Sequence, residues 1–154
     1  GMVDGPNVYG YVRGNSTRFT DPLGLFRIRK NCGEKTGLIR VEVQRACDRV
    51  DSIIKNPKLA ACIKKRCQNA SISCDRCCPP GRNAYHVSRR YHNVWVRERG
   101  FRFCINNIRH AHRFGPTALH EWAHSCGWRH GDGGGVPYDP GPDAWHWPNG
   151  PGRR

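Results

Sequence analysis

The hydrophobic pattern of residues 38–67 predicts a short strand followed by two helices. The stretch LIRVEV, residues 38–43, alternates apolar with charged side chains; this period is typical of a half-buried strand, and a helix is the alternative. Apolar residues recur at helical spacing over residues 44–54. Asn56 and Pro57 end that helix, and a second helix is expected over residues 58–67.

The rest of the pattern adds loops and paired strands. Residues 69–93 are rich in cysteine, proline and glycine, so we expect a loop there. Residues 93–106 alternate again on either side of a turn expected near Gly100, which predicts a hairpin or paired strands. The tail, residues 131–154, is rich in glycine and proline and is expected to be irregular. Together these elements predict a small domain of the α+β class.

The stretch ALHEWAHSCGWRHGD carries three histidines and one glutamate. A helix is expected over residues 116–126, because Gly115 can serve as the N-cap and Pro116 suits the first helical position. A spacing of four residues places His120 and His124 one turn apart on the same helix face, where their imidazoles aim at a common point.

A third histidine follows a reversal of the chain. Gly127 is expected to end the helix, since glycine adopts the left-handed conformation that a reversal needs. The chain then returns and brings His130 to the same point. Three neutral imidazoles with one open position are typical of a catalytic zinc site, so the sequence predicts one Zn²⁺ ion. Glu121 lies beside this metal face, where its carboxylate can reach a water at the metal without ligating.

Two further predictions concern the surroundings of this site. Asp132 is the alternative third ligand, or it accepts the ring N–H of a ligand and so fixes the imidazole tautomer. The spacing of the residues alone leaves both His130 and Asp132 open as the third ligand. The other histidines are expected to be surface or packing residues: His86, His92, His110, His112 and His146.

Nine cysteines are dense for a chain of 154 residues and predict disulfides formed in an oxidising environment. Because nine is an odd number, at least one thiol is unpaired, metal-bound or intermolecular. The C-x-x-C spacing of Cys74 and Cys77 is also half of a zinc knuckle. A second C-x-x-C or an H-x-x-x-H does not follow at a usual distance, so we favour disulfides.

The net charge of +14 arises entirely after residue 25, because residues 1–25 carry two acidic and two basic side chains. A basic segment such as residues 26–154 attracts nucleic acid, acidic proteins or anionic membrane surfaces. The chain has no run of about 18 apolar residues, so no membrane-spanning helix is expected. The first ten residues lack the basic and apolar regions of a secretory signal peptide, so export is expected to use another route.

The first 25 residues resemble a known junction. The words NVYGYVRGN and DPLGL resemble the end of the core region in Rhs-repeat proteins, which are large β-shell toxins with variable C-terminal cargo. The resemblance implies a junction segment over residues 1–25 and a cargo domain over residues 26–154. It also implies self-cleavage after the motif, whose residues here are Asp21, Pro22, Gly24 and Leu25.

The same resemblance implies a cellular setting and a set of partners. The protein would be made in a bacterial cytoplasm and delivered into a target cell, as in type VI secretion. The Rhs core shell and a secretion spike or chaperone would hold the cargo before release. A cognate immunity protein is expected in the producing cell, and the cargo's charge favours an acidic one.

The full string H-E-x-x-H-x-x-G-x-x-H, residues 120–130, resembles the zinc-binding consensus of metzincin metallopeptidases. The resemblance implies a zincin-like domain with His120, His124 and His130 as zinc ligands, and it favours His130 over Asp132 because Gly127 places His130 where the consensus does. It implies Glu121 as the general base in peptide-bond hydrolysis by a metal-activated water.

The chain departs from that family beneath the metal. Metzincins place a methionine turn there, whereas the only methionine here is Met2. The words GVPYD, residues 135–139, are a candidate substitute. In that interpretation Val136 is the apolar floor and Tyr138 is a hydrogen-bond donor to the transition state.

We therefore expect a zinc metalloendopeptidase toxin that acts on a protein or peptide in the target cell. A metal-dependent nuclease toxin is an alternative that the positive charge favours. Phosphodiester hydrolysis usually enlists Mg²⁺ with carboxylates or a His/Asn pair, so nucleic acid is not the expected substrate. A non-catalytic, disulfide-rich zinc-binding module is the other alternative, and it predicts a fourth protein ligand such as Cys126 or Asp132.

Overall fold

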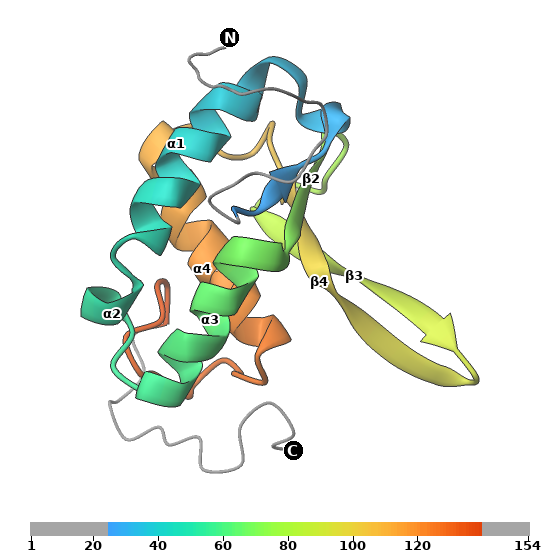
Figure 1. Ribbon diagram of the computed structural model, residues 1–154. Helices are drawn as coiled ribbons and strands as arrows, with labels where there is room; N and C mark the ends of the chain where they lie inside the picture. The colour runs from blue at the N-terminus through green and yellow to red at the C-terminus, as the bar shows by residue number, and fades with distance from the viewer. Residues whose placement is uncertain (1–24, 140–154) are drawn as a thin grey trace, which may run out of the picture.

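The computed structural model describes residues 25–139, with the backbone alone for residues 87–91 and 94–99 (Figure 1). The helical elements are η1 (Lys30–Lys35), α1 (Thr36–Cys47), α2 (Val50–Ile53), α3 (Pro57–Asn69), η2 (Ala111–Arg113) and α4 (Phe114–Ser125). The strands are β1 (Arg27–Ile28), β2 (Ser71–Asp75), β3 (Ala84–Tyr91) and β4 (Val94–Cys104). The predicted α+β class is confirmed. Of the junction motif, Asp21, Pro22 and Gly24 lie outside the described residues, and Leu25 is the first residue inside them.

The strands form one sheet in the order β1-β2-β4-β3. Strands β1, β2 and β4 run parallel, and β3 pairs antiparallel with β4 at the sheet edge. Helices α1, α3 and α4 lie together beside the sheet, while the far part of the β3–β4 hairpin extends away from them (Figure 1). A register shift between His86 and Ser88 separates this extension from the inner part of the hairpin.

The core forms where α4 meets the sheet. Phe101 and Phe103 point inward from β4 and are 1% and 0% exposed. Their ring centroids lie 4.9 Å apart in an edge-to-face arrangement, and Trp122 of α4 packs 5.6 Å from Phe101. Such aromatic pairs contribute about 0.5–1.5 kcal/mol beyond the area that they bury. The packing therefore fixes the position of α4 against the inner half of the hairpin.

The strand predicted over residues 38–43 is wrong, and its helical alternative is correct. In α1 the fully buried side chains are Ile39 and Val43, four residues apart, whereas Val41 between them is 54% exposed. A strand would have turned all three to the same face. The residues that the fold buries are thus spaced at a helical period. Their burial decides the local structure against the alternating pattern of residues 38–43.

The first of the two predicted helices is broken, and the second is confirmed. α1 ends at Cys47, and only Val50–Ile53 continues as the separate α2. α3 begins at Pro57, where the Asn56 side chain accepts hydrogen bonds from the first-turn amides of Lys58 and Leu59. None of the helices described here is both long and apolar enough to cross a bilayer.

The predicted loop over residues 69–93 and the predicted turn near Gly100 are both wrong. The loop region contains β2 and β3, and β4 continues straight through Gly100. A Cβ at Gly100 would lie 2.6 Å from the carbonyl oxygen of Ser71, so this glycine permits close approach of β2. The hairpin reverses instead at His92 and Asn93, whose positive φ values of 48° and 63° suit a tight hairpin turn.

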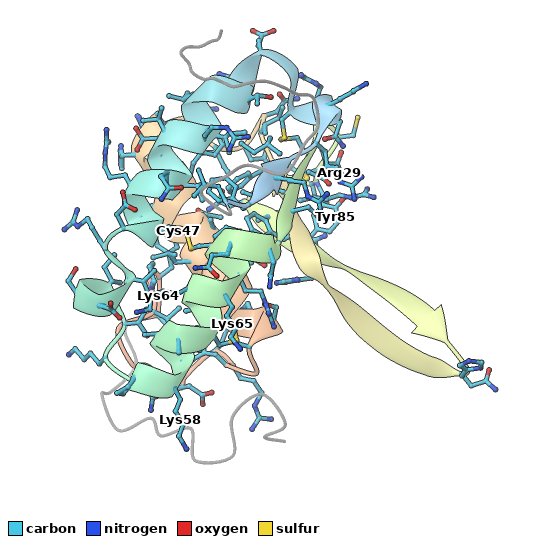
Figure 2. All side chains as sticks on the ribbon, viewed as in Figure 1. Arg29, Cys47, Lys58, Lys64, Lys65 and Tyr85 are labelled. Carbon is cyan, nitrogen blue, oxygen red and sulfur yellow. A yellow bond between two sulfur atoms is a disulfide. The ribbon has the colours of Figure 1, made fainter. Side chains whose placement is uncertain are left out.

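Four disulfides staple the described chain, and they indicate maturation in an oxidising environment. Cys47 on α1 bonds Cys67 on α3 (Figure 2). The other pairs are Cys32–Cys74, Cys62–Cys126 and Cys78–Cys104. Cys77 is the free, exposed cysteine. The disulfide prediction is confirmed, and Cys74 is not part of a zinc knuckle because its sulfur is bonded to Cys32.

α4 crosses α1 at very short range. A Cβ added to Gly115 would lie 2.8 Å from the carbonyl oxygen of Glu42 and 2.9 Å from the Cβ of Ala46. Gly115 is therefore a packing residue inside α4, and not the predicted N-cap, because the helix already begins at Phe114. Any larger side chain here would push the two helices apart.

Gly115→Ala is expected to destabilise the oxidised protein by about 1–3 kcal/mol, because the added methyl group overpacks the α1–α4 contact. Gly37→Ala is the matched control, since its Cβ in α1 would meet nothing within 4 Å. That change should instead leave stability unaltered or raise it by up to about 1 kcal/mol. Urea unfolding with the disulfides intact measures both, and equal midpoints for the two variants would contradict the close contact.

Candidate metal centre

Helix α4 presents two histidines from one face. Its apolar side chains Leu119, Trp122 and Ala123 are fully buried, and this burial turns His120 and His124 toward the opposite, accessible side. The predicted helix is confirmed, although it extends over Phe114–Ser125. The two imidazole centroids lie 4.9 Å apart, as the four-residue spacing requires.

Gly127 reverses the chain at the end of α4, as predicted. Its φ is +96°, which lies in the left-handed region. The amide of Trp128 donates to the carbonyl of Ala123, and the amide of Gly127 donates to that of His124. These two bonds form a Schellman motif, which satisfies the last carbonyls of the helix. The tight reversal brings His130 back over the face that carries the other two histidines.

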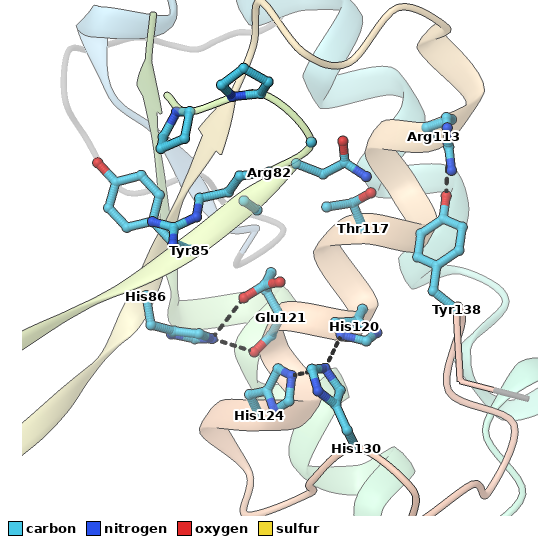
Figure 3. A pocket seen from close by; sticks show the side chains of 15 residues that line it. Arg82, Tyr85, His86, Arg113, Thr117, His120, Glu121, His124, His130 and Tyr138 are labelled. Carbon is cyan, nitrogen blue, oxygen red and sulfur yellow. Dashed lines mark hydrogen bonds and ion pairs between the residues drawn. The ribbon is translucent and has the colours of Figure 1, made fainter. Parts of the chain in front are cut away.

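The three imidazoles meet at one point (Figure 3). Nε2 of His130 lies 3.1 Å from Nε2 of His120 and 3.1 Å from Nε2 of His124. One ring nitrogen from each of the three residues falls within 4.8 Å of the others. Nitrogen ligands about 2.0–2.1 Å from a tetrahedral Zn²⁺ stand about 3.3 Å from each other, so this spacing suits a metal ion.

Backbone carbonyls determine which ring nitrogen of His120 and of His124 is available to bind a metal. Nδ1 of His120 lies 2.6 Å from the carbonyl oxygen of Pro137, and Nδ1 of His124 lies 3.1 Å from that of Trp128. A carbonyl oxygen only accepts, so both Nδ1 atoms carry the proton and both Nε2 atoms present lone pairs. His130 can donate one proton to only one of them. At least one of the two 3.1 Å contacts is therefore left without a well-formed hydrogen bond, and a cation bound between the nitrogens would satisfy the lone pairs there.

Trp128 forms the floor under the three histidines. It is 1% exposed, and its indole ring lies 5.2, 5.0 and 5.7 Å from the rings of His120, His124 and His130. Its Nε1 donates to the carbonyl of Gly133 at 3.0 Å, which fixes the ring. Val136, the predicted floor, is buried in the core at 2% exposed, but the side chain in contact with all three imidazoles is the tryptophan inside the motif.

Burial keeps the helical histidines neutral. It lowers the pKa of His120, and it lowers the pKa of His124 to about 4, with the neighbouring His120 adding to the effect. Neutral imidazoles are the form that binds metal. Both residues are thus ready to act as ligands at neutral pH.

Asp132 is not among the converging side chains. Its Oδ2 accepts a hydrogen bond from the backbone amide of Arg129 at 2.9 Å, which closes the turn that carries His130. Of the two candidates for the third ligand, the structure therefore brings His130 to the pair on α4.

Glu121 lies beside the histidines and contacts a residue that the sequence did not indicate. Nε2 of His86, on β3, lies 2.6 Å from the backbone carbonyl oxygen of Glu121 and 3.4 Å from its Oε1 (Figure 3). The two side chains are 7% and 13% exposed. His86 was expected to be a surface or packing residue and not a ligand; it is a packed residue outside the group of three, and its contact with Glu121 is an addition to that expectation. The 35 residues between the two hid this contact from sequence patterns.

A cleft of about 1060 Å³ contains the centre. Residues 79–86 form one wall, and the face of α4 with the histidines and Glu121 forms the other. Tyr138 lies at one end, 49% exposed, with its ring centroid 6.3 Å from that of His120. Its hydroxyl accepts from Nε of Arg113 at 3.5 Å, so it points along the cleft and away from the three nitrogens (Figure 3).

Comparisons with known proteins do not add to this description. A scan against protein-family models and searches of curated proteins and of solved structures found no match. The site is therefore interpreted from its own geometry.

His130→Ala is expected to weaken zinc binding by more than about 100-fold, because it removes one of three converging nitrogens. Asp132→Asn is the matched control, since its amide oxygen can still accept from the Arg129 amide. We expect that variant to stay within about threefold of the wild type. Competition with a zinc-sensitive chelating dye measures both affinities, and the reverse order would make Asp132 the ligand.

The metal-free protein is expected to lose stability as the pH falls from about 6.5 to about 4. In this window an unfolded histidine takes up a proton while folded His124 stays neutral, so the unfolded state binds more protons and acid favours it. Thermal unfolding with a chelator present, at several pH values, measures the effect. His124→Asn should flatten the dependence, and an unchanged slope in that variant would contradict the assignment.

Proposed function

We propose that the three histidines bind one zinc ion and that the cleft hydrolyses peptide bonds. The single observation that carries the proposal is the convergence of three Nε2 atoms, two of them in histidines whose Nδ1 protons are held by backbone carbonyls. Three nitrogen ligands leave one position of a tetrahedral ion open, which is typical of catalytic sites. Bound there, zinc would lower the pKa of a water and polarise a carbonyl group.

Glu121 supplies the general base in this proposal. It follows His120 directly on α4, so its carboxylate lies beside the three nitrogens and faces the cleft. Glu121 takes a proton from the attacking water and passes it to the departing amine, which completes hydrolysis of the amide. This is the role that the metzincin motif implies for the residue.

His86 is a positioning residue for Glu121. Its Nε2 reaches both the backbone carbonyl and the carboxylate of Glu121, at 2.6 and 3.4 Å. Because His86 belongs to β3 and Glu121 to α4, the contact fixes the base relative to the sheet edge. An acid without such a partner would sample several rotamers in the cleft.

The sheet edge offers a place for a peptide. β3 pairs with β4 on one side only within the described sheet, and its residues 84–86 line the cleft. An extended peptide can add to such an edge through main-chain hydrogen bonds, independent of its sequence. A peptide bound along β3 would pass over the face of α4 that carries Glu121 and the histidines.

The two alternatives have less support. A purely structural zinc site needs a fourth protein ligand. Cys126 is bonded to Cys62, and Asp132 accepts from the Arg129 amide, so neither joins the histidines in the described chain. A nuclease remains the second candidate on the strength of the charge of +14. The candidate ligand atoms are all histidine nitrogens, with a single carboxylate beside them, and this combination favours the peptidase.

We further propose that this domain is delivered as Rhs cargo and restrained by an immunity protein. The support is the junction-like sequence of residues 7–25, most of which lies outside the described residues. The four disulfides favour action in an oxidising compartment of the target cell.

Glu121→Gln is expected to lower peptide hydrolysis by about 10²–10⁴-fold while zinc stays bound, because the amide cannot take the proton. The measurement is cleavage of a mixed library of quenched fluorescent peptides by the zinc-loaded chain. Glu34→Gln, an exposed acid on η1, is the matched control and should cleave like the wild type.

Parallel incubation with plasmid DNA and with RNA separates the nuclease alternative. Zinc-dependent cleavage of nucleic acid with no peptide cleavage would reject the peptidase. Full peptide cleavage by the Glu121→Gln chain would reject Glu121 as the base.

A further inference from the structure

The face of α4 that carries the histidines continues toward the start of the helix. Arg113 and Thr117 precede Glu121 by two turns and one turn, and all three line the same cleft. At about 1.5 Å per residue, Thr117 stands about 6 Å and Arg113 about 12 Å from Glu121 along the helix axis. The cleft therefore has a second polar end beyond the metal centre.

Thr117 is the unusual residue at this end. It is 3% exposed, and its Oγ1 has no hydrogen-bond partner among the described residues. A helical threonine normally bonds back to the carbonyl four residues earlier, and a buried hydroxyl without a partner costs free energy. Because the residue lines the cleft, a ligand group in the cleft can supply the missing partner.

Arg113 supplies a positive charge one helical turn before Thr117, in the lining of the same cleft. Its guanidinium lies 5.3 Å from the ring centroid of Tyr138, and its Nε donates to the Tyr138 hydroxyl at 3.5 Å. Tyr138 thus holds the guanidinium from one side, with its backbone in the left-handed region at φ 65°. No carboxylate within the described residues pairs with Arg113, so its remaining N–H donors can serve a ligand.

We propose that Arg113 and Thr117 form a subsite for a carboxylate of the substrate, an inference that rests on the proposed peptide hydrolysis. A guanidinium fork matches the geometry of a carboxylate, and a hydroxyl adds a further donor. An extended peptide advances about 3.3 Å per residue. The carboxylate would therefore lie about two to four residues from the bond cleaved. It is either an acidic side chain or the C-terminus of the peptide.

Binding to the zinc-loaded Glu121→Gln chain tests this subsite without turnover. The probes are hexapeptide mixtures that contain Glu or Gln at one position, each with a C-terminal acid or amide, labelled with an uncharged fluorophore. We expect at least about tenfold tighter binding of the peptides that carry a carboxylate, as charged hydrogen bonds provide. Preference for Glu over Gln identifies a side chain, and preference for acid over amide identifies the terminus.

Three further variants, each in the Glu121→Gln background, locate the preference. In Arg113→Gln, the affinities for peptides with and without the carboxylate should differ by no more than about twofold. Thr117→Val should reduce the preference about threefold or more without lowering thermal stability, since the change removes an unpartnered hydroxyl at constant shape. Lys65→Gln, which removes an exposed charge on α3, should leave it unaltered (Figure 2).

Several results would overturn the assignment. They are equal binding of all four peptide mixtures, a preference that survives both Arg113→Gln and Thr117→Val, or an equal loss in Lys65→Gln. Binding of a single-stranded oligonucleotide that depends on Arg113, without any peptide preference, would reassign the site to nucleic acid. Absence of hydrolysis by the wild-type chain would reject the proposed function alone, because binding to Glu121→Gln is measured separately.

Discussion

Helix α4 packs into the core on one side and lines the cleft on the other, and the rest of the fold is constrained by the need to hold it in that orientation. One side of the helix buries Leu119, Trp122 and Ala123 completely. The other side lines the cleft with polar residues. Helix α1 approaches so closely that Gly115 is needed, and α3 is bonded to the end of α4 through Cys62–Cys126. Neighbours on several sides thus hold the helix in one rotational setting, and that setting aims the histidines.

Features encoded by short-range spacing could be predicted from the sequence. The pair His120 and His124, the reversal at Gly127 and the return of His130 depend on residues within eleven positions, where helix geometry and glycine conformation decide the outcome. α3 could be predicted for the same reason, because Asn56 caps it locally. The α+β class followed from the presence of both periods in one chain.

Features decided by distant packing could not be predicted. Residues 38–43 alternate like a strand, yet the fold buries Ile39 and Val43 as one helical stripe of α1. Cysteine and proline hid β2, although Ile72 and Cys74 alternate inward as a strand requires. His86 acquires its role only when β3 meets α4, 35 residues farther along the chain, and that contact has no periodic signal in the sequence. Trp128 lies inside the motif, but no periodic signal marks it as the residue beneath the imidazoles.

Trp128 gives the metal centre a thermodynamic property beyond its chemistry. The same buried ring belongs to the hydrophobic core and touches all three imidazoles, so movement of the ligands is opposed by core packing. Metal occupancy and folding then become linked equilibria: each favours the other by the same coupling free energy. A chain that unfolds must release its ion, and a chain that binds one gains stability against heat and proteolysis that grows with the logarithm of its affinity. For a domain of this size, the ion would act alongside the disulfides as a further cross-link.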